Sequence, residues 1–193
     1  MEIDPIVIAM DGPSGSGKSS VSREVASTLR FRYLDTGAMY RALTWWMLRE
    51  GVDVEDPGAV GALAGKAELM IGTDPAGPTV RVDGTDVSVD IRCREVTGSV
   101  SAVSAVPAVR ARLVGMQQQI ISATLAAGCG IVVEGRDIGT VVAPDAPVKM
   151  FLTASADARA TRRTAEVLQT GENATIHQMT ADMARRDRLD SSR

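Results

Sequence analysis

The sequence of 193 residues contains only two cysteines, one histidine and 3% aromatic residues. Cys93 and Cys129 are far apart and neither belongs to a CxxC pair, so neither a zinc site nor a disulfide framework is indicated. No apolar run approaches the roughly 20 residues of a membrane-spanning helix. The net charge of -3 argues against the basic surface typical of nucleic-acid-binding proteins. We therefore expect a cytoplasmic protein without nucleic-acid or membrane partners, and no feature requires more than a monomer.

Lysine is also scarce, since only Lys18, Lys66 and Lys149 occur and the other basic residues are arginines. Arginine suits bidentate binding of phosphate groups, although GC-rich coding would produce the same bias. The length fits one core with sub-domain insertions, and 45% hydrophobic residues are enough to form it.

The N-terminal part has the pattern of a βαβ unit. The apolar run at residues 6–10 is typical of a strand buried on both faces. A helix is predicted from Lys18 onward, with an apolar stripe at Val21, Val25 and Leu29. Residues 33–35 then form a second short strand.

The rest of the chain continues the α/β pattern. We predict a helix over about 38–50, a long helix from Val109 toward Gly128, buried strands at 131–133 and 148–152, and arginine-rich helices from Ser155 that are interrupted at 171–173. Between residues 67 and 90, strand-like pieces at 69–71 and 80–82 alternate with turns. This alternation predicts a small antiparallel sheet inserted into an α/β core.

Residues 12–19, GPSGSGKS, match the GxxxxGK[ST] pattern in full, between a predicted strand and a predicted helix. Glycines in such a loop let successive N–H groups point at phosphate oxygens, the lysine reaches the β- and γ-phosphates, and the hydroxyl ligates Mg²⁺. The predicted ATP site consists of Gly12, Pro13, Ser14, Gly15, Ser16, Gly17, Lys18, Ser19 and Ser20, with Lys18 catalytic and Ser19 the metal ligand. The alternative, a glycine-rich turn that binds nothing, would not require Lys18.

The loop alone does not fix the fate of the γ-phosphate, because kinases, GTPases and mechanical ATPases all use one. A GTPase needs a guanine-reading NKxD segment, which the sequence lacks. A kinase needs an acceptor pocket, and the segments DTGAMYR at 35–41 and EGRDIGT at 134–140 each follow a predicted strand. They would bring Arg41 and Arg136 to one edge of the sheet as an anion clamp.

Together, GPSGSGKS, DTGAMYR, EGRDIGT followed by APDAPVKMFL, and the terminal RRDRLDSSR resemble the bacterial cytidylate kinases. These motifs occur in the family's order from residue 12 to residue 193. The resemblance implies a P-loop three-layer αβα fold with a parallel sheet, an inserted antiparallel sub-domain that binds the nucleoside monophosphate, and a helical lid. It also implies transfer of the γ-phosphate of ATP, bound with Mg²⁺, to CMP or dCMP.

The family's layout implies one kinase domain over 1–193. The core would comprise about 1–50 and 105–193, the inserted CMP-binding region about 60–104, and the lid about 155–185. The family pattern continues past the final DSSR with a strand and a helix that these residues lack, so we expect a C-terminally truncated chain.

The resemblance also assigns roles on the acceptor side. Arg41 and Arg136 would hold the CMP phosphate, and Arg136 would also be catalytic. The remaining CMP-binding candidates are Thr36, Ser101, Arg110 and Asp137 around the cytosine, Tyr40 at the rim of the sheet, and Arg186, Asp190 and Arg193 near the pentose. Family members often have serine in place of Thr36, and the hydroxyl is retained here. For Tyr40 and Ser101, packing or capping remains the alternative.

Asp137 is the candidate for base selection. A carboxylate accepts a hydrogen bond from the N4 amino group of cytosine, which uracil lacks, and an unpaired buried acceptor penalises the wrong base. The alternative is an internal salt bridge to Arg136 or Arg110 that braces the loop.

Phosphoryl transfer to CMP requires no general base, because the acceptor oxygen is already ionised near neutral pH. Catalysis is therefore expected from positioning and from cations. Arg159, Arg162 and Arg163 lie on the helix that the resemblance places beside the lid and are candidate transition-state residues. The alternative is a solvated basic face that pairs with Asp157 or Glu166.

Two other functions remain compatible with the sequence. One is a P-loop kinase for another small acceptor, such as UMP, dTMP or shikimate, and the other is a non-catalytic ATP-binding module. Acceptor-dependent release of ADP distinguishes them.

Overall fold

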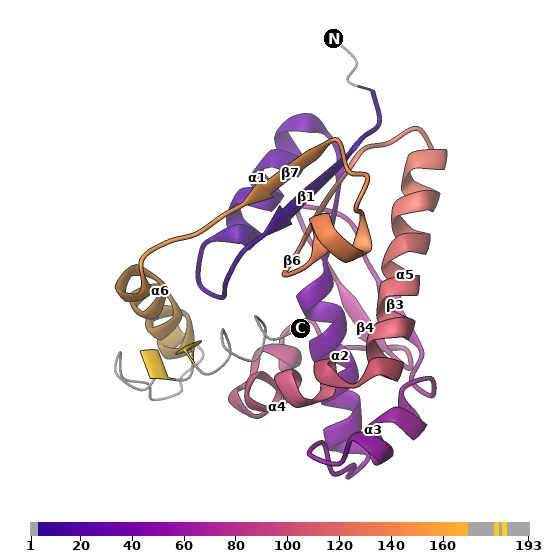
Figure 1. The fold of residues 1–193 in the computed structure, drawn as a ribbon, viewed down its shortest axis with the longest axis vertical. Coiled ribbons are helices and arrows are strands. Elements are labelled where there is room, and N and C mark those ends of the chain that lie inside the picture. The colour runs from indigo at the N-terminus through magenta and orange to yellow at the C-terminus, as the bar shows by residue number, and fades with distance from the viewer. Residues whose placement is uncertain (1–3, 170–179, 182, 185–193) are drawn as a thin grey trace.

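A four-stranded parallel sheet forms the centre of the computed structural model, which describes residues 4–169, 180, 181, 183 and 184 (Figure 1). Its strands are β1 (Val7–Asp11), β2 (Arg32–Asp35), β6 (Ile131–Gly135) and β7 (Val148–Phe151), in the order β2-β6-β1-β7. Asp11 is in register with Gly135, and Asp35 with Glu134. The carboxyl ends of β1, β2 and β6 therefore meet at one edge of the sheet, as the predicted parallel arrangement requires.

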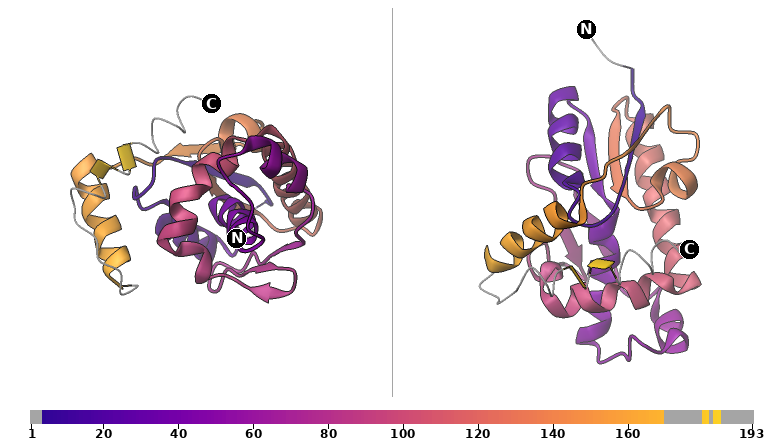
Figure 2. Two further views of the ribbon diagram at one scale, coloured as in Figure 1. Left: turned by 90° about the horizontal axis from the view of Figure 1, so that it is seen from below. Right: turned by 60° about the vertical axis from the view of Figure 1, so that its left-hand side comes forward.

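Helices cover both faces of this sheet, because successive strand side chains point to opposite faces. Ile8 and Val132 pack on the side of α1 (Lys18–Leu29). The alternate side chains pack against α2 (Thr36–Arg49) and α5 (Pro107–Ala126). The right-hand view of Figure 2 shows α1 and α5 on opposite sides of the sheet. The predicted three-layer αβα architecture is confirmed.

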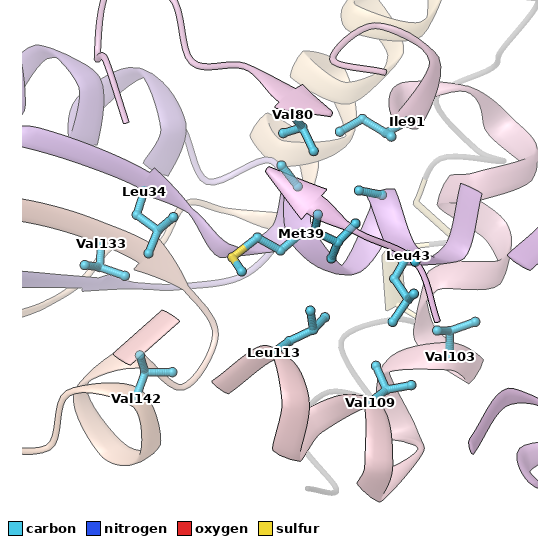
Figure 3. Close-up of a cluster of buried hydrophobic side chains, with 14 of the residues drawn as sticks. Leu34, Met39, Leu43, Val80, Ile91, Val103, Val109, Leu113, Val133 and Val142 are labelled. Carbon is cyan, nitrogen blue, oxygen red and sulfur yellow. The ribbon is translucent and has the colours of Figure 1, made fainter. Parts of the chain in front are cut away.

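The predicted antiparallel sheet is also present, and it lies between α2 and α5 in the chain. This region contains α3 (Pro57–Leu63), β3 (Leu69–Ile71), β4 (Val80–Val82), β5 (Thr85–Asp86), a 3₁₀ turn η1 (Asp90–Arg92) and α4 (Arg94–Ala105). Strand β4 pairs antiparallel with both β3 and β5. Val80, Ile91 and Val103 belong to the same buried cluster as Met39 and Leu43 of α2 (Figure 3). The inserted elements are therefore packed directly onto the α/β core.

Helix α4 was not predicted, and the hydrophobic pattern placed the next helix slightly late, at Val109. The boundary is explained by Pro107, which occupies the first turn of α5 and has no N–H to donate within α4. The preceding residue, Val106, is extended, as a residue before proline prefers to be. The chain turns there, and α4 and α5 form two separate helices.

One prediction of burial is wrong, and one predicted apolar stripe is only partly in contact with the sheet. Strand β7 was expected to be buried, yet Met150 and Phe151 are 45% and 71% exposed. Within the described residues β7 pairs only with β1 and lies at the edge of the sheet, which explains this exposure. On α1, Val25 and Leu29 of the stripe pack against the sheet, whereas Val21 is exposed. Ser22 and Ala26 are fully buried. Small side chains let this helix lie close to the sheet, a feature that hydrophobicity alone does not reveal.

Two further elements follow β6. A short π-helix, η2 (Ile138–Val142), continues from the EGRD segment, and α6 (Ala156–Gln169) lies beside the turn between β1 and α1 (Figure 1). Among the described residues, no helix combines the length and apolar character needed to cross a membrane.

Candidate active site

A cavity of about 430 Å³ opens at the edge where β1, β2 and β6 end. It is lined by Ser14, Gly15, Ser16, Gly17, Lys18, Ser19, Ser20, Asp35, Thr36, Gly37, Tyr40, Arg41, Arg92, Val100, Ser101, Ser104, Arg110, Glu134, Gly135, Arg136, Asp137, Thr140 and Val141. We call the glycine-rich segment of residues 12–19 the phosphate loop. Every predicted acceptor residue in the described part of the chain shares one cavity with it. Gly12 and Pro13 lie outside this lining, and Arg186, Asp190 and Arg193 lie outside the described residues.

The phosphate loop has the backbone geometry that its glycines predict. Gly15 and Gly17 adopt φ values of 73° and 94°, which favour glycine strongly. Gly17 is the N-cap of α1, and no side chain in the described region caps that helix. Lys18 folds back so that its Nζ donates to the Pro13 carbonyl oxygen at 2.9 Å. The first N–H groups of α1 and the Lys18 ammonium are thus placed for binding an anion.

The Lys18 ammonium is held in an unfavourable environment. Burial and the nearby positive charge of Arg136 lower the pKa of Lys18 to about 8, although the carboxylates of Glu134 and Asp35 partly oppose this shift. A polyanion in the cavity would stabilise the charged ammonium and raise its pKa again. The site therefore gains favourable electrostatic energy when phosphates bind.

This pKa predicts how ATP affinity depends on pH. Because phosphates favour protonated Lys18, affinity for MgATP should change little from pH 7 to 8 and then fall by up to about tenfold per pH unit above pH 8. Isothermal titration calorimetry between pH 7 and 9.5 measures this slope. In Lys18→Arg, whose guanidinium does not titrate in that range, the decline should disappear. An equal decline in both proteins would contradict the assignment.

Glu134 is a site residue that the sequence analysis did not assign. It is the fourth residue of β6 and is only 3% exposed. Its Oε1 accepts a hydrogen bond of 2.7 Å from the hydroxyl of Tyr33, and its Oε2 has no hydrogen-bond partner among the described residues. Burial, followed by the negative charge of Asp35, raises the pKa of Glu134 above its ordinary value. A buried, unpaired carboxylate oxygen beside the phosphate loop is suited to a cation.

The start of α2 brings the DTGAMYR segment into the cavity. Asp35 caps this helix by accepting the Ala38 N–H at 2.9 Å. The Thr36 hydroxyl donates to the Glu134 backbone oxygen at 2.7 Å, which ties the end of β2 to the end of β6. Tyr40 and Arg41 follow on the first turns of the helix and line the cavity.

Arg110 and Asp137 form an ion pair within the cavity. This is the internal salt bridge that the sequence analysis considered as an alternative for Asp137. Burial lowers the pKa of Arg110, but its hydrogen bond to Asp137 and the opposite charge outweigh that effect, so the pKa is raised. The pair brings a residue of α5 and the EGRD segment together, and both side chains remain about one quarter to one third exposed, at 26% and 30%.

Arg92 is a second residue that the sequence did not single out. It belongs to the inserted region, lines the cavity, and lies with its Nη2 3.8 Å from Oδ2 of Asp35. Its side chain is 52% exposed. The inserted region thus contributes a guanidinium beside the acceptor residues of the core.

The arginines of α6 reach the phosphate loop from the other end of the chain. Arg159 donates through Nη1 to the Ser14 carbonyl oxygen at 3.3 Å, and Arg162 donates through Nη1 to that of Ser16 at 3.1 Å. The side chain of Arg163 lies outside the described part of the structure. Although these residues do not line the cavity, two of the predicted arginines lie against the loop that would hold ATP.

The parallel sheet, the glycine-rich loop at the end of β1 and the cation-lined cavity beside it define a P-loop nucleotide-binding protein. The family model described as cytidylate kinase matches residues 8–193. Relatives named cytidylate kinase include one from Streptomyces coelicolor, 57% identical over 97% of this chain and 78% of that protein, and one from Rhodococcus opacus, 56% identical over 100% and 82%. Another, from Streptomyces avermitilis, is 53% identical over 99% of this chain and 80% of that protein. The chain belongs to the cytidylate kinase family.

Proposed function

We propose that this protein transfers the γ-phosphate of MgATP to CMP or dCMP, giving ADP and CDP or dCDP. The observation that carries the proposal is the single cavity shared by the phosphate loop and the acceptor arginines. Lys18 and the N-terminus of α1 would bind the β- and γ-phosphates, and Arg41 and Arg136 would bind the acceptor phosphate. Two anions that repel each other in water would thus be held together by fixed cations.

The residues present fit a magnesium ion that arrives with ATP. Magnesium prefers oxygen ligands and is usually held by one or two protein groups together with substrate phosphates. The Ser19 hydroxyl lies in the first turn of α1, and the unpaired Oε2 of Glu134 is a second oxygen at the same cavity. When bound, the ion would neutralise part of the charge of the ATP phosphates. Metal binding would require the ionised carboxylate of Glu134, and burial, which raises the pKa of this group, opposes that form until the cation is present.

The chain's own residues account for the remaining steps. Arg159 and Arg162 already lie against the phosphate loop, so closure of the predicted lid over ATP would bring guanidinium groups to the transferring phosphoryl group. Closure would also exclude water that could hydrolyse ATP. Arg110 and Asp137 would present a donor and an acceptor to the cytosine ring. In that arrangement their ion pair orients Asp137 rather than competing with its role in base recognition.

The proposal includes the predicted layout of the chain. The inserted region of about 60–104 would bind the acceptor through Arg92 and Ser101, and about 155–185 would form the lid over ATP. The partners would be ATP, CMP and dCMP, with a monomer acting in the cytoplasm.

An acceptor panel tests this function. With MgATP, release of ADP is measured separately with CMP, dCMP, UMP, dTMP and shikimate in a coupled assay. Preferential turnover of CMP and dCMP is expected. Preference for another acceptor would reassign the substrate, and ATP binding without acceptor-dependent ADP release would refute catalysis.

A further inference from the structure

The side chain of Asp11 links the two halves of the cavity. Asp11 is the last residue of β1, and the phosphate loop begins at the next residue. Its Oδ1 accepts the Ile138 N–H at 2.8 Å and its Oδ2 accepts the Gly139 N–H at 2.9 Å. The two oxygens of one carboxylate therefore accept hydrogen bonds from two successive backbone amides, which lie 127 and 128 residues away in the sequence.

These two hydrogen bonds fix the end of a very short segment. Gly135 is the last residue of β6 and is in register with Asp11 across the sheet. Only Arg136 and Asp137 separate it from the two amides that Asp11 holds. The sheet fixes one end of this segment and the carboxylate fixes the other, so the backbone that carries both acceptor residues has little freedom to move.

The surroundings of Asp11 make this link stiff. Its backbone oxygen accepts the Leu152 N–H at 2.8 Å, which ties the same residue to the chain that follows β7. Ile138 is fully buried, and a Cβ added to Gly139 would lie 3.4 Å from Oδ2 of Asp11 and 3.2 Å from Cδ of Lys149. The two amides therefore lie in a closely packed environment beside the carboxylate.

We propose that Asp11 is a positioning residue that sets where Arg136 and Asp137 stand relative to the phosphate loop. It would therefore control both the binding of the acceptor phosphate and the selection of its base, without touching either nucleotide. This inference rests on the proposed function, because it concerns the same acceptor site. The chemistry specifically requires a carboxylate: asparagine has one acceptor oxygen, and its NH₂ group would face a backbone donor.

The test is the Asp11→Asn variant, assayed with MgATP and either CMP or UMP. The KM for CMP should rise by about tenfold or more, since displacement of a binding group by a fraction of an ångström to 1 Å has effects of this size. The preference for CMP over UMP, measured as the ratio of kcat/KM, should fall because Asp137 moves. The dissociation constant for MgATP, measured by calorimetry without acceptor, should stay within about twofold, because Lys18 and the loop are retained.

A matched control separates this role from ordinary stabilisation. Asp56 also accepts a backbone N–H, from Gly58 at 2.8 Å, but lies outside the cavity, so Asp56→Asn should leave all three quantities unchanged. A merely structural effect would reduce the amount of active enzyme and lower kcat without changing KM or the CMP to UMP ratio. Gly139→Ala crowds the backbone whose amide donates to Asp11, because its added Cβ would lie 3.2 Å from Cδ of Lys149 and 3.4 Å from Oδ2 of Asp11, and it should give a smaller change in the same direction. If Asp11→Asn does not fold, the same measurements on Gly139→Ala test the proposal.

Unchanged KM and base preference in folded Asp11→Asn, or an equal loss of affinity for MgATP, would overturn the role of Asp11. Failure of the wild-type chain to phosphorylate CMP would instead refute the proposed function, and with it the site that Asp11 is said to position. The two failures are therefore distinguished by the wild-type measurement alone.

Discussion

Replacing Lys18 with alanine is expected to lower kcat/KM for MgATP by about 10²- to 10³-fold, the loss typical when one fixed donor to a developing charge is removed. The ammonium is buried enough to have a pKa of about 8, so it interacts with phosphates where water screens poorly. Lys18 also bonds to the carbonyl of Pro13 across the loop and is therefore already oriented. Both ground-state binding and transfer of the γ-phosphate should suffer, and the measurement is steady-state kinetics with CMP saturating.

Lys66→Ala provides the matched control for this prediction. Lys66 is an exposed lysine between α3 and β3 and does not line the cavity. Its removal should leave kcat/KM within about twofold, as for most exposed substitutions. Near-normal turnover by folded Lys18→Ala would show that the phosphate loop does not hold the transferring group.

Arg136→Ala should produce a comparable loss of kcat/KM, about 10²- to 10³-fold, but on the acceptor side. Arg136 would neutralise the acceptor phosphate and stabilise part of the negative charge on the transferring group. Its loss should therefore raise KM for CMP and lower kcat. Affinity for MgATP should be preserved or improved. Arg136 lowers the pKa of Lys18 through its like charge, and its removal should therefore raise that pKa and move the pH dependence of ATP binding upward.

Arg32→Ala is a suitable control for Arg136. Arg32 is exposed and lies at the start of β2, the end of the strand opposite the cavity. Its removal should change neither KM for CMP nor the pH dependence of ATP binding. If Arg136→Ala impaired MgATP binding and CMP binding equally, the division of the cavity into donor and acceptor sides would be wrong.

Local patterns in the sequence were enough to predict the sheet and most of the cavity. Parallel strands place their carboxyl ends at one edge, so motifs that follow β1, β2 and β6 had to meet there. Lys18, Arg41 and Arg136 could be brought together on this argument without any structure. The inserted antiparallel sheet was also predicted, because its turns and short β-branched pieces are local features.

The features that the sequence did not reveal depend on contacts between distant residues. In the sequence, Glu134 is simply the first residue of the EGRDIGT segment. Only the structure shows that Tyr33 donates a hydrogen bond to one of its carboxylate oxygens, and that the other has no partner among the described residues. Arg92 lies in a region without a recognisable motif, and its place beside Asp35 depends on how η1 packs on α2. The roles of Arg186, Asp190 and Arg193 stay predictions.

Competition by a bisubstrate ligand tests the central claim most directly. In such a ligand, adenosine and cytidine are joined through a chain of phosphates long enough to replace ATP and CMP together. One cavity that holds both nucleotides with their phosphates facing each other predicts competitive inhibition against MgATP and against CMP, with affinity well above that of either substrate. Competition against only one of the two would contradict a shared cavity and the phosphoryl transfer built on it.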